Sequence, residues 1–138
     1  MNNVYFQNQV VTITYEPEWE LGAAQWRGFL SSAEFREAVT KCLQLTEEYK
    51  PLRWLGDNRK MKVIRQADQD WFAANALPRI QASTIRRHAT VVSEDIFNKM
   101  AVEQIIRRAE NPEALFLQEF NSRQMALAWL KQPLLVSY

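Results

Sequence analysis

The sequence predicts an α/β fold built on a mostly parallel sheet. Short segments rich in β-branched and aromatic residues alternate with longer segments whose apolar residues recur at helical spacing. The predicted order is β-β-α-β-α-β-α-β-α, and a short turn after the first strand makes that strand antiparallel. The chain has 138 residues, of which 47% are hydrophobic, so it can bury one full core. We therefore expect a single domain over residues 1–138, with a folded core from about 10 to 130.

The first two strands are expected to form a hairpin. Residues 10–15 (VVTITY) are rich in β-branched and aromatic residues and place apolar side chains at alternate positions. Residues 16–18 (EPE) are typical of a turn. Residues 19–26 then supply the second strand, which Gly28 ends.

The clearest helix begins at Ser31. Ser31 and Glu34 have the spacing of a capping box, in which each side chain satisfies the free backbone N–H of the other residue. Pro51 closes the helix. Its apolar face consists of Phe35, Ala38, Val39, Cys42, Leu45, Thr46 and Tyr49.

Strands and helices alternate through the middle of the chain. A short apolar run around Trp54 predicts a buried strand, and a helix is expected from about Ala67. Pro78 must kink or interrupt that helix, because proline removes a donor and clashes with the preceding turn. Residues 88–92 (HATVV) predict another buried strand.

Two more helices and one strand complete the predicted order. Residues 115–120 form the last strand, and Asn121 with Gln124 is expected to cap a final helix through Leu130. Ser93 is expected to cap the helix before them. The apolar side chains of that helix predicted to face inward are Ile96, Phe97 and Met100.

The strongest candidate for a functional site is the dense polar cluster that follows Trp54. We expect it to be a loop at the carboxyl end of a buried strand. Ligands of open parallel sheets lie beyond these carboxyl ends, where Ser31 and Ser93 are also expected. The candidate ligand-binding residues are therefore Asp57, Asn58, Arg59, Lys60, Ser31 and Ser93.

Two interpretations of this cluster stay open. In the first, Arg59 clamps a phosphate, a carboxylate or a phospholipid headgroup, because free N–H groups at the start of the next helix also favour anions. In the second, Asp57 and Arg59 pair with each other while Lys60 and Lys62 lie in solvent. Asp57 has no obvious His or Glu partner in the sequence, so we expect no catalytic residues and no enzyme activity.

Charge and cysteine content exclude several classes of function. The 17 basic and 16 acidic residues give a net charge of +1, which supplies no overall field to attract nucleic acid or an anionic membrane. Cys42 is the only cysteine and His88 the only histidine, so we expect no internal disulfide, no metal site and no cofactor. The N-terminus lacks signal-peptide features and no apolar run is long enough to span a bilayer, so we expect a cytoplasmic protein.

The chain carries more large aromatic side chains than one small core needs. We expect part of this surplus to form a homodimer interface, since two-fold dimers are the commonest oligomers. A lipid-sized pocket would use the same side chains. The residues concerned are Trp19, Trp26, Trp71, Phe72 and Trp129.

Several segments together carry a resemblance to a known family. They are Trp26-Arg27-Gly28, Phe35, residues 54–61 (WLGDNRKM), residues 71–78 and residues 126–130 (ALAWL). In order and length they resemble the small bacterial proteins grouped with STAS domains. These have the anti-sigma-factor-antagonist-like fold, which is also compared with SEC14-type lipid-binding domains. The resemblance spans the chain from about residue 10 to 130.

This resemblance implies regulatory protein binding. In the family, the switch is phosphorylation of a serine near the start of the helix after the middle strand, but residues 55–82 here contain no Ser, Thr or Tyr. We therefore expect a non-catalytic regulatory or protein-interaction module without that switch. The alternative is a binder of a small anionic or lipid-like ligand near residues 57–62.

Overall fold

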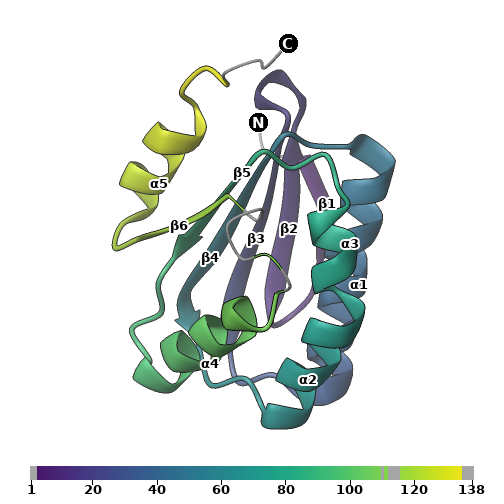
Figure 1. Ribbon diagram of the computed structural model, residues 1–138, viewed down its shortest axis with the longest axis vertical. Coiled ribbons are helices and arrows are strands. Elements are labelled where there is room, and N and C mark those ends of the chain that lie inside the picture. The colour runs from purple at the N-terminus through teal and green to yellow at the C-terminus, as the bar shows by residue number, and fades with distance from the viewer. Residues whose placement is uncertain (1–2, 110, 112–115, 135–138) are drawn as a thin grey trace.

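The computed structural model describes residues 3–109, 111 and 116–134, and its centre is a β-sheet (Figure 1). Antiparallel pairing joins β1 to β2 and β2 to β3, whereas the pairs from β3 to β6 are parallel. The predicted α/β fold with a mostly parallel sheet is therefore confirmed. In the described part of the chain the six strands lie in sequence order: β1 (Asn3–Gln7), β2 (Val11–Glu16), β3 (Leu21–Gly28), β4 (Arg53–Met61), β5 (Arg87–Val91) and β6 (Leu117–Phe120).

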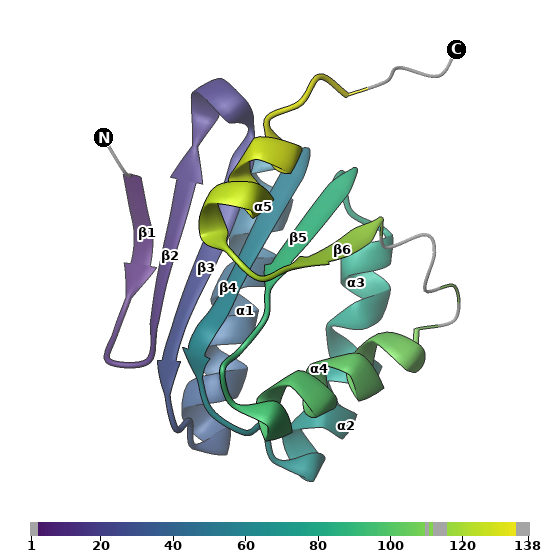
Figure 2. The ribbon, with the colours of Figure 1, turned by 90° about the vertical axis from the view of Figure 1, so that its left-hand side faces the viewer.

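Helices cover both faces of the sheet (Figures 1 and 2). From β3 to β6, each connection leads to the next strand on the same side of the sheet. Because these crossovers have the same handedness, the helices between β3 and β6 lie on one face of the sheet. No helix among the described residues has the length and apolarity that a membrane span requires. The first face carries α1 (Ser32–Tyr49), α2 (Gln66–Asn75), α3 (Leu77–Gln81) and α4 (Ile96–Arg107), and the second carries α5 (Arg123–Leu130).

The two faces of the sheet hold two separate cores. The larger core packs the inward side chains of α1 to α4 against β2, β3 and β4, with Ile13 and Phe35 near its centre. The smaller core lies under α5, where Ala126 and Leu130 pack on Leu55 and Val91. Because successive strand residues point to opposite faces, β4 contributes to both cores.

Two arginines near the amino ends of β4 and β5 hold α5 on the sheet. The buried Arg53 donates from Nε to the carbonyl of Leu130 at 2.6 Å and from Nη1 to the carbonyl of Trp19 at 2.6 Å. Arg87 donates from Nη1 to the carbonyl of Trp129 at 3.0 Å. These carbonyls at the end of α5 lack partners within the helix, and cations at that end are also favoured by the helix dipole.

Several predicted boundaries are confirmed. At the start of α1, Glu34 N donates to Ser31 Oγ at 3.1 Å and Ser31 N donates to Glu34 Oε1 at 2.9 Å, which is the predicted capping box. The expected interruption before Pro78 is present, because α2 ends at Asn75 and α3 starts at Leu77. The hairpin of β2 and β3 also forms, with Pro17–Trp19 as a single 3₁₀ turn between them.

The expected loop after Trp54 is wrong, because this segment is the second half of strand β4. Asp57 pairs in register with both Gln25 of β3 and Val91 of β5. The prediction failed because charged residues are rare in central strands unless they are paired, and the strand neighbours Gln25 and Val91 lie far away in the sequence. The structure also has an edge strand that was not predicted, β1, which lies ahead of the first predicted strand.

The predicted orientation of α4 is wrong. Asp95, not Ser93, caps this helix, with Phe97 N donating to Asp95 Oδ1 at 2.9 Å. Asn98, Ala101 and Ile105 are buried instead. The small side chain of Ala101 and a hydrogen bond from Asn98 Nδ2 to the carbonyl of Lys62 bring this face close to the sheet. The side chains predicted to face inward lie exposed: Ile96, Phe97 and Met100.

The predicted cap of α5 is displaced by one residue. Ser122 caps this helix by accepting a hydrogen bond from Met125 N at 3.0 Å, rather than Asn121 acting with Gln124. Serine and asparagine are about equally good caps, so the choice depended on tertiary packing. The predicted end of the helix at Leu130 is confirmed.

Candidate functional site

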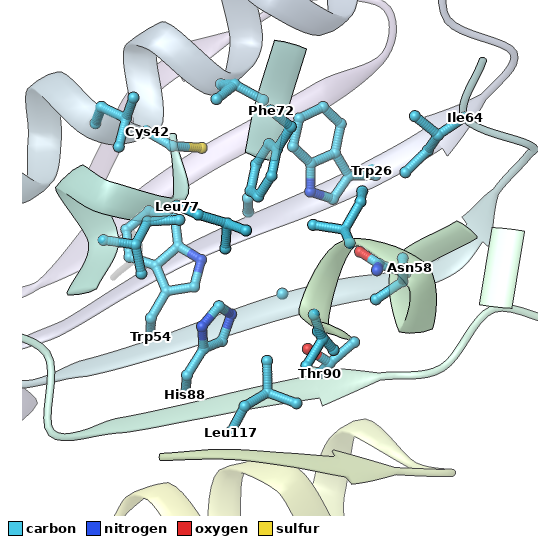
Figure 3. Close-up of a pocket in the computed structure, with 18 of the residues that line it drawn as sticks. Trp26, Cys42, Trp54, Asn58, Ile64, Phe72, Leu77, His88, Thr90 and Leu117 are labelled. Carbon is cyan, nitrogen blue, oxygen red and sulfur yellow. The ribbon is translucent and has the colours of Figure 1, made fainter. Parts of the chain in front are cut away.

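An interior cavity of about 140 Å³ lies between the sheet and helices α1 to α4. The rings of Trp26, Trp54 and Phe72 form part of its wall, as Figure 3 shows. None of the described residues that line the cavity carries a charge at neutral pH. Its volume is close to the roughly 150 Å³ of an apolar protein cavity that holds benzene.

The register of the strands explains why the cavity is there. Ala24 of β3, Gly56 of β4 and Thr90 of β5 are direct neighbours across three strands, and all three line the cavity. The adjacent row carries the large side chains of Trp54 and His88, which are also direct neighbours. A row of small residues beside a row of large ones leaves a hollow under the helices, because helices resting on the large side chains cannot also reach the small ones.

The two glycines on this face of the sheet have different surroundings. A Cβ atom on Gly22 would lie 2.4 Å from Trp54 Cζ3, so Gly22 is needed for the indole to pack. A Cβ atom on Gly56 would have its nearest neighbours, which include the Asn58 amide oxygen and His88 Nε2, at 3.9 Å. Close packing therefore does not explain Gly56, and the space above it belongs to the cavity.

Polar groups on the floor of the cavity come from β4 and β5. The His88 ring lines the cavity together with Asn58 and Thr90 (Figure 3). His88 Nδ1 is inaccessible to solvent and has no hydrogen-bond partner. Burial lowers the pKa of His88 to about 4, so the imidazole is neutral at physiological pH. A neutral imidazole offers one donor and one acceptor to a molecule in the cavity.

Cys42 of α1 reaches the cavity from the helix side (Figure 3). Burial raises the pKa of its thiol to about 12, so the thiol stays protonated. Nucleophilic cysteines need a lowered pKa or an adjacent base that removes the proton. Burial therefore keeps both Cys42 and His88 uncharged in this cavity.

On the opposite face of β4, Asp57 forms the centre of an ion-pair cluster. Arg59 donates from Nε to Asp57 Oδ1 at 2.9 Å and from Nη2 to Oδ2 at 2.8 Å. Arg123 of α5 donates from Nη1 to Oδ2 at 3.2 Å. Burial opposes ionisation of Asp57, but the hydrogen bonds and charge of Arg59, with the hydrogen bond from Arg123, lower its pKa below the ordinary value. The arrangement corresponds to the second interpretation of the cluster, in which Asp57 and Arg59 pair.

Asn58 is the one sequence-predicted candidate on the cavity wall. Gln25 pairs with Asp57 and Arg27 with Lys60, so β4 has one residue more than β3 over this stretch. Such a bulge turns the following side chains to the other face. Asn58 and Met61 consequently both line the cavity, and the exposed Lys60 lies between them.

The two candidate serines have local partners. Ser31 caps α1, as described above. Ser93 donates from Oγ to the carbonyl of Met61 at 2.7 Å and accepts from Asp95 N at 3.0 Å. The six predicted residues therefore do not converge on one site.

Of the five aromatic residues offered for a lipid-sized pocket, Trp26 and Phe72 line the cavity. Sequence reasoning did not locate the cavity itself, because its residues are far apart in the chain and individually ordinary. The available signal was the alternation within strands, which places Trp54, Gly56 and Asn58 on one face of β4, and His88 and Thr90 on one face of β5. These two sets of residues can be placed beside each other only when the pairing register of β4 and β5 is known, and the sequence alone does not give that register. A glycine in the middle of an apolar strand was the best single indication.

The class of protein cannot be taken from known proteins. No protein-family model, no curated protein and no solved structure matches this chain. Among the described residues, no group of three or more His, Cys, Asp or Glu side chains is placed to hold a metal ion. The function must therefore be argued from the cavity and the surface.

Proposed function

We propose that this chain is a non-catalytic, STAS-like domain that binds a small, largely apolar molecule in the cavity between the sheet and helices α1 to α4. The observation that carries the proposal is the cavity lined by Gly56, in the middle of a buried central strand, where an added Cβ atom would meet nothing nearer than 3.9 Å. Protein interiors normally leave few voids larger than a water molecule, and glycine weakens a strand. A ligand site accounts for both departures. The order and lengths of the segments support the STAS-like assignment.

The chemistry of the walls favours a neutral ligand. An ion in this cavity would lose its hydration without gaining a partner of opposite charge. An anionic ligand near residues 57–62 would instead have to compete with Asp57 for Arg59. We therefore place the ligand in the cavity rather than at the polar cluster.

The proposal is tested by filling the cavity from its floor. Native mass spectrometry of the gently purified protein, followed by denaturing extraction, should reveal a small neutral molecule bound to the wild type. Gly56→Leu should abolish its binding, because the new side chain occupies the space above β4. Gly56→Ala is the matched control, since one methyl group leaves most of the cavity open.

Two results would contradict the proposal. One is that Gly56→Leu carries as much ligand as the wild type while remaining folded. The other is a wild-type protein that carries nothing and takes up none of a panel of small neutral aromatic and aliphatic probes.

A second candidate function, protein interaction, is favoured by an exposed apolar surface at the carboxyl ends of the parallel strands. Phe29 directly follows β3 and is 74% exposed, and Phe97 in the first turn of α4 is 65% exposed. Ile96 and Met100 are exposed on the same helix. The end of β3 and the start of α4 lie at the same end of the molecule (Figure 2). Exposed groups of this kind commonly mark protein interfaces.

This second candidate includes the predicted homodimer. Sedimentation velocity over a concentration series should show self-association of the wild type that is weakened in Phe97→Ser. Arg107→Ser, an equally exposed change at the far end of α4, is the control. A wild-type protein that is monomeric at all concentrations would contradict the predicted homodimer.

A further inference from the structure

We infer that the ligand of the cavity is a neutral, single-ring aromatic molecule that carries one hydroxyl group, and that this hydroxyl forms a hydrogen bond with the imidazole of His88. The inference rests on the proposed function, because it needs a ligand in the cavity. It names the chemical class of that ligand and the residue that selects it.

The size and shape of the cavity set the first part of the inference. A cavity of about 140 Å³ can hold one six-membered ring, by comparison with the roughly 150 Å³ apolar cavity that takes up benzene. The absent side chain of Gly56 leaves the floor flat between Ala24 and Thr90. Indole and phenyl groups of Trp26, Trp54 and Phe72 stand around this floor (Figure 3). Aromatic rings pack well against one another in offset or edge-to-face arrangements.

The position of the His88 ring determines which polar group the ligand carries. Nε2 lies at the floor of the cavity, 3.9 Å from the place where a Cβ atom on Gly56 would stand. The other nitrogen, Nδ1, is inaccessible and does not face the cavity. Buried polar atoms in proteins almost always have a hydrogen-bond partner, and an apolar side chain of similar volume would fill the same place without any unpaired polar group. A ligand hydroxyl that pairs with Nε2 gives the cavity side of the imidazole such a partner.

The neutral state of His88 restricts which polar group the ligand can carry. Burial holds the ring in its uncharged form, in which one nitrogen donates and the other accepts. A hydroxyl group can pair with Nε2 in either neutral form of the ring, because it both donates and accepts. A carboxylate or an ammonium group would be buried without a charged partner, which is strongly unfavourable.

The test uses phenol and toluene, which have nearly the same size and differ in carrying a hydroxyl or a methyl group on the ring. Isothermal titration calorimetry gives both dissociation constants for the wild type, His88→Leu and Thr40→Val. We expect His88→Leu to reduce the preference for phenol over toluene about tenfold. Thr40→Val removes a hydroxyl that donates to the carbonyl of Arg36 on α1, outside the cavity, and should leave that preference unchanged.

A second measurement needs no variant. His88 is the only histidine of the chain, so in protein made without a histidine tag the imidazole nitrogens give an unambiguous signal in a long-range proton–nitrogen NMR spectrum. Phenol should shift these nitrogen resonances in a direction that toluene does not.

The outcomes separate the inference from the proposed function. If phenol and toluene bind but the His88 nitrogens do not respond to phenol, or the preference is the same in His88→Leu, the inference is wrong and the cavity remains a ligand site. If neither probe binds the wild type, both the inference and the proposed function are wrong.

Discussion

Replacing each of two glycines by alanine on neighbouring strands should change stability in opposite directions. Gly22 and Gly56 lie on the same face of the sheet, and neither has the positive φ that would strain an alanine. At Gly56 the added methyl group meets its nearest neighbours at 3.9 Å, an ordinary contact. At Gly22 it would lie 2.4 Å from Trp54 Cζ3 and 3.3 Å from Leu45 Cδ2.

The magnitudes follow from these contacts. Removing the conformational freedom of glycine within a strand stabilises by about 0.5–1 kcal/mol, and burying one methyl group adds about 0.8 kcal/mol. Gly56→Ala should therefore raise the free energy of unfolding by about 1–2 kcal/mol, which is roughly 3–8 °C in Tm for a chain of this length. Gly22→Ala should lower it by about 1–3 kcal/mol, because the Trp54 ring must shift within a packed core.

Urea unfolding followed by far-UV circular dichroism is the suitable assay. Tryptophan fluorescence is a poor choice, since Gly22→Ala disturbs Trp54 itself. The proteins should first be unfolded and dialysed, because a retained ligand stabilises only the forms that bind it. A loss of stability in Gly56→Ala would show that the space above β4 is already filled. An unchanged Gly22→Ala would show that Trp54 is loosely held, and either result would refute the packing argument.

Further predictions concern the groups around the sheet. Asp57→Asn should lower the free energy of unfolding at pH 7 by about 1–3 kcal/mol. The pKa of Asp57 is lower in the folded protein than in the unfolded chain. The contribution of this carboxylate to the free energy of unfolding is therefore present above about pH 4 and is lost as the pH falls through the folded pKa. Urea titrations of wild type and variant should consequently give the same stability in acid. Arg53→Met should lose about 2–3 kcal/mol and should selectively reduce hydrogen-exchange protection in α5, because it leaves the carbonyl of Leu130 at the end of that helix unpaired. Ser31→Ala should lose about 1 kcal/mol in thermal unfolding, as for other helix caps. Cys42 should react with a small alkylating reagent at pH 8 far more slowly than a free cysteine, because its thiol is buried and protonated. Bound phenol should slow the reaction further. A rate equal to that of free cysteine would show that the thiol is open to solvent.

Elements with strong local signals were predictable from the sequence. The capping box of Ser31 and Glu34 and the amphipathic pattern that follows define α1 without help from the rest of the chain. The alternation of strands and helices likewise defines the α/β class, because parallel strands need crossover connections. In each case every element is marked by a pattern within its own segment of the sequence.

Elements determined by distant partners were not predictable. β4 continues through Asp57 because Gln25 of β3 and Val91 of β5, both distant in sequence, pair with it in register, and Arg123 of α5 adds a hydrogen bond to its carboxylate. The orientation of α4 depends on a hydrogen bond from Asn98 to the backbone of Lys62. Local hydrophobicity favoured the opposite orientation, with Phe97 inside, and packing against the sheet overrode it.

The candidate site illustrates the same limit most clearly. Residues 56–59 are consecutive in sequence, but strand alternation and the bulge divide them between two faces of the sheet. Asp57 pairs with Arg59 and with Arg123 of α5, whereas Gly56 and Asn58 line the cavity. Reading the charged pair as the site followed from the usual rule that polar clusters carry function. In this fold the charges of Asp57 and Arg59 satisfy each other, and the glycine before them lines the cavity that we propose as the ligand site. The residue with the least chemistry of its own therefore gives the stronger argument about function.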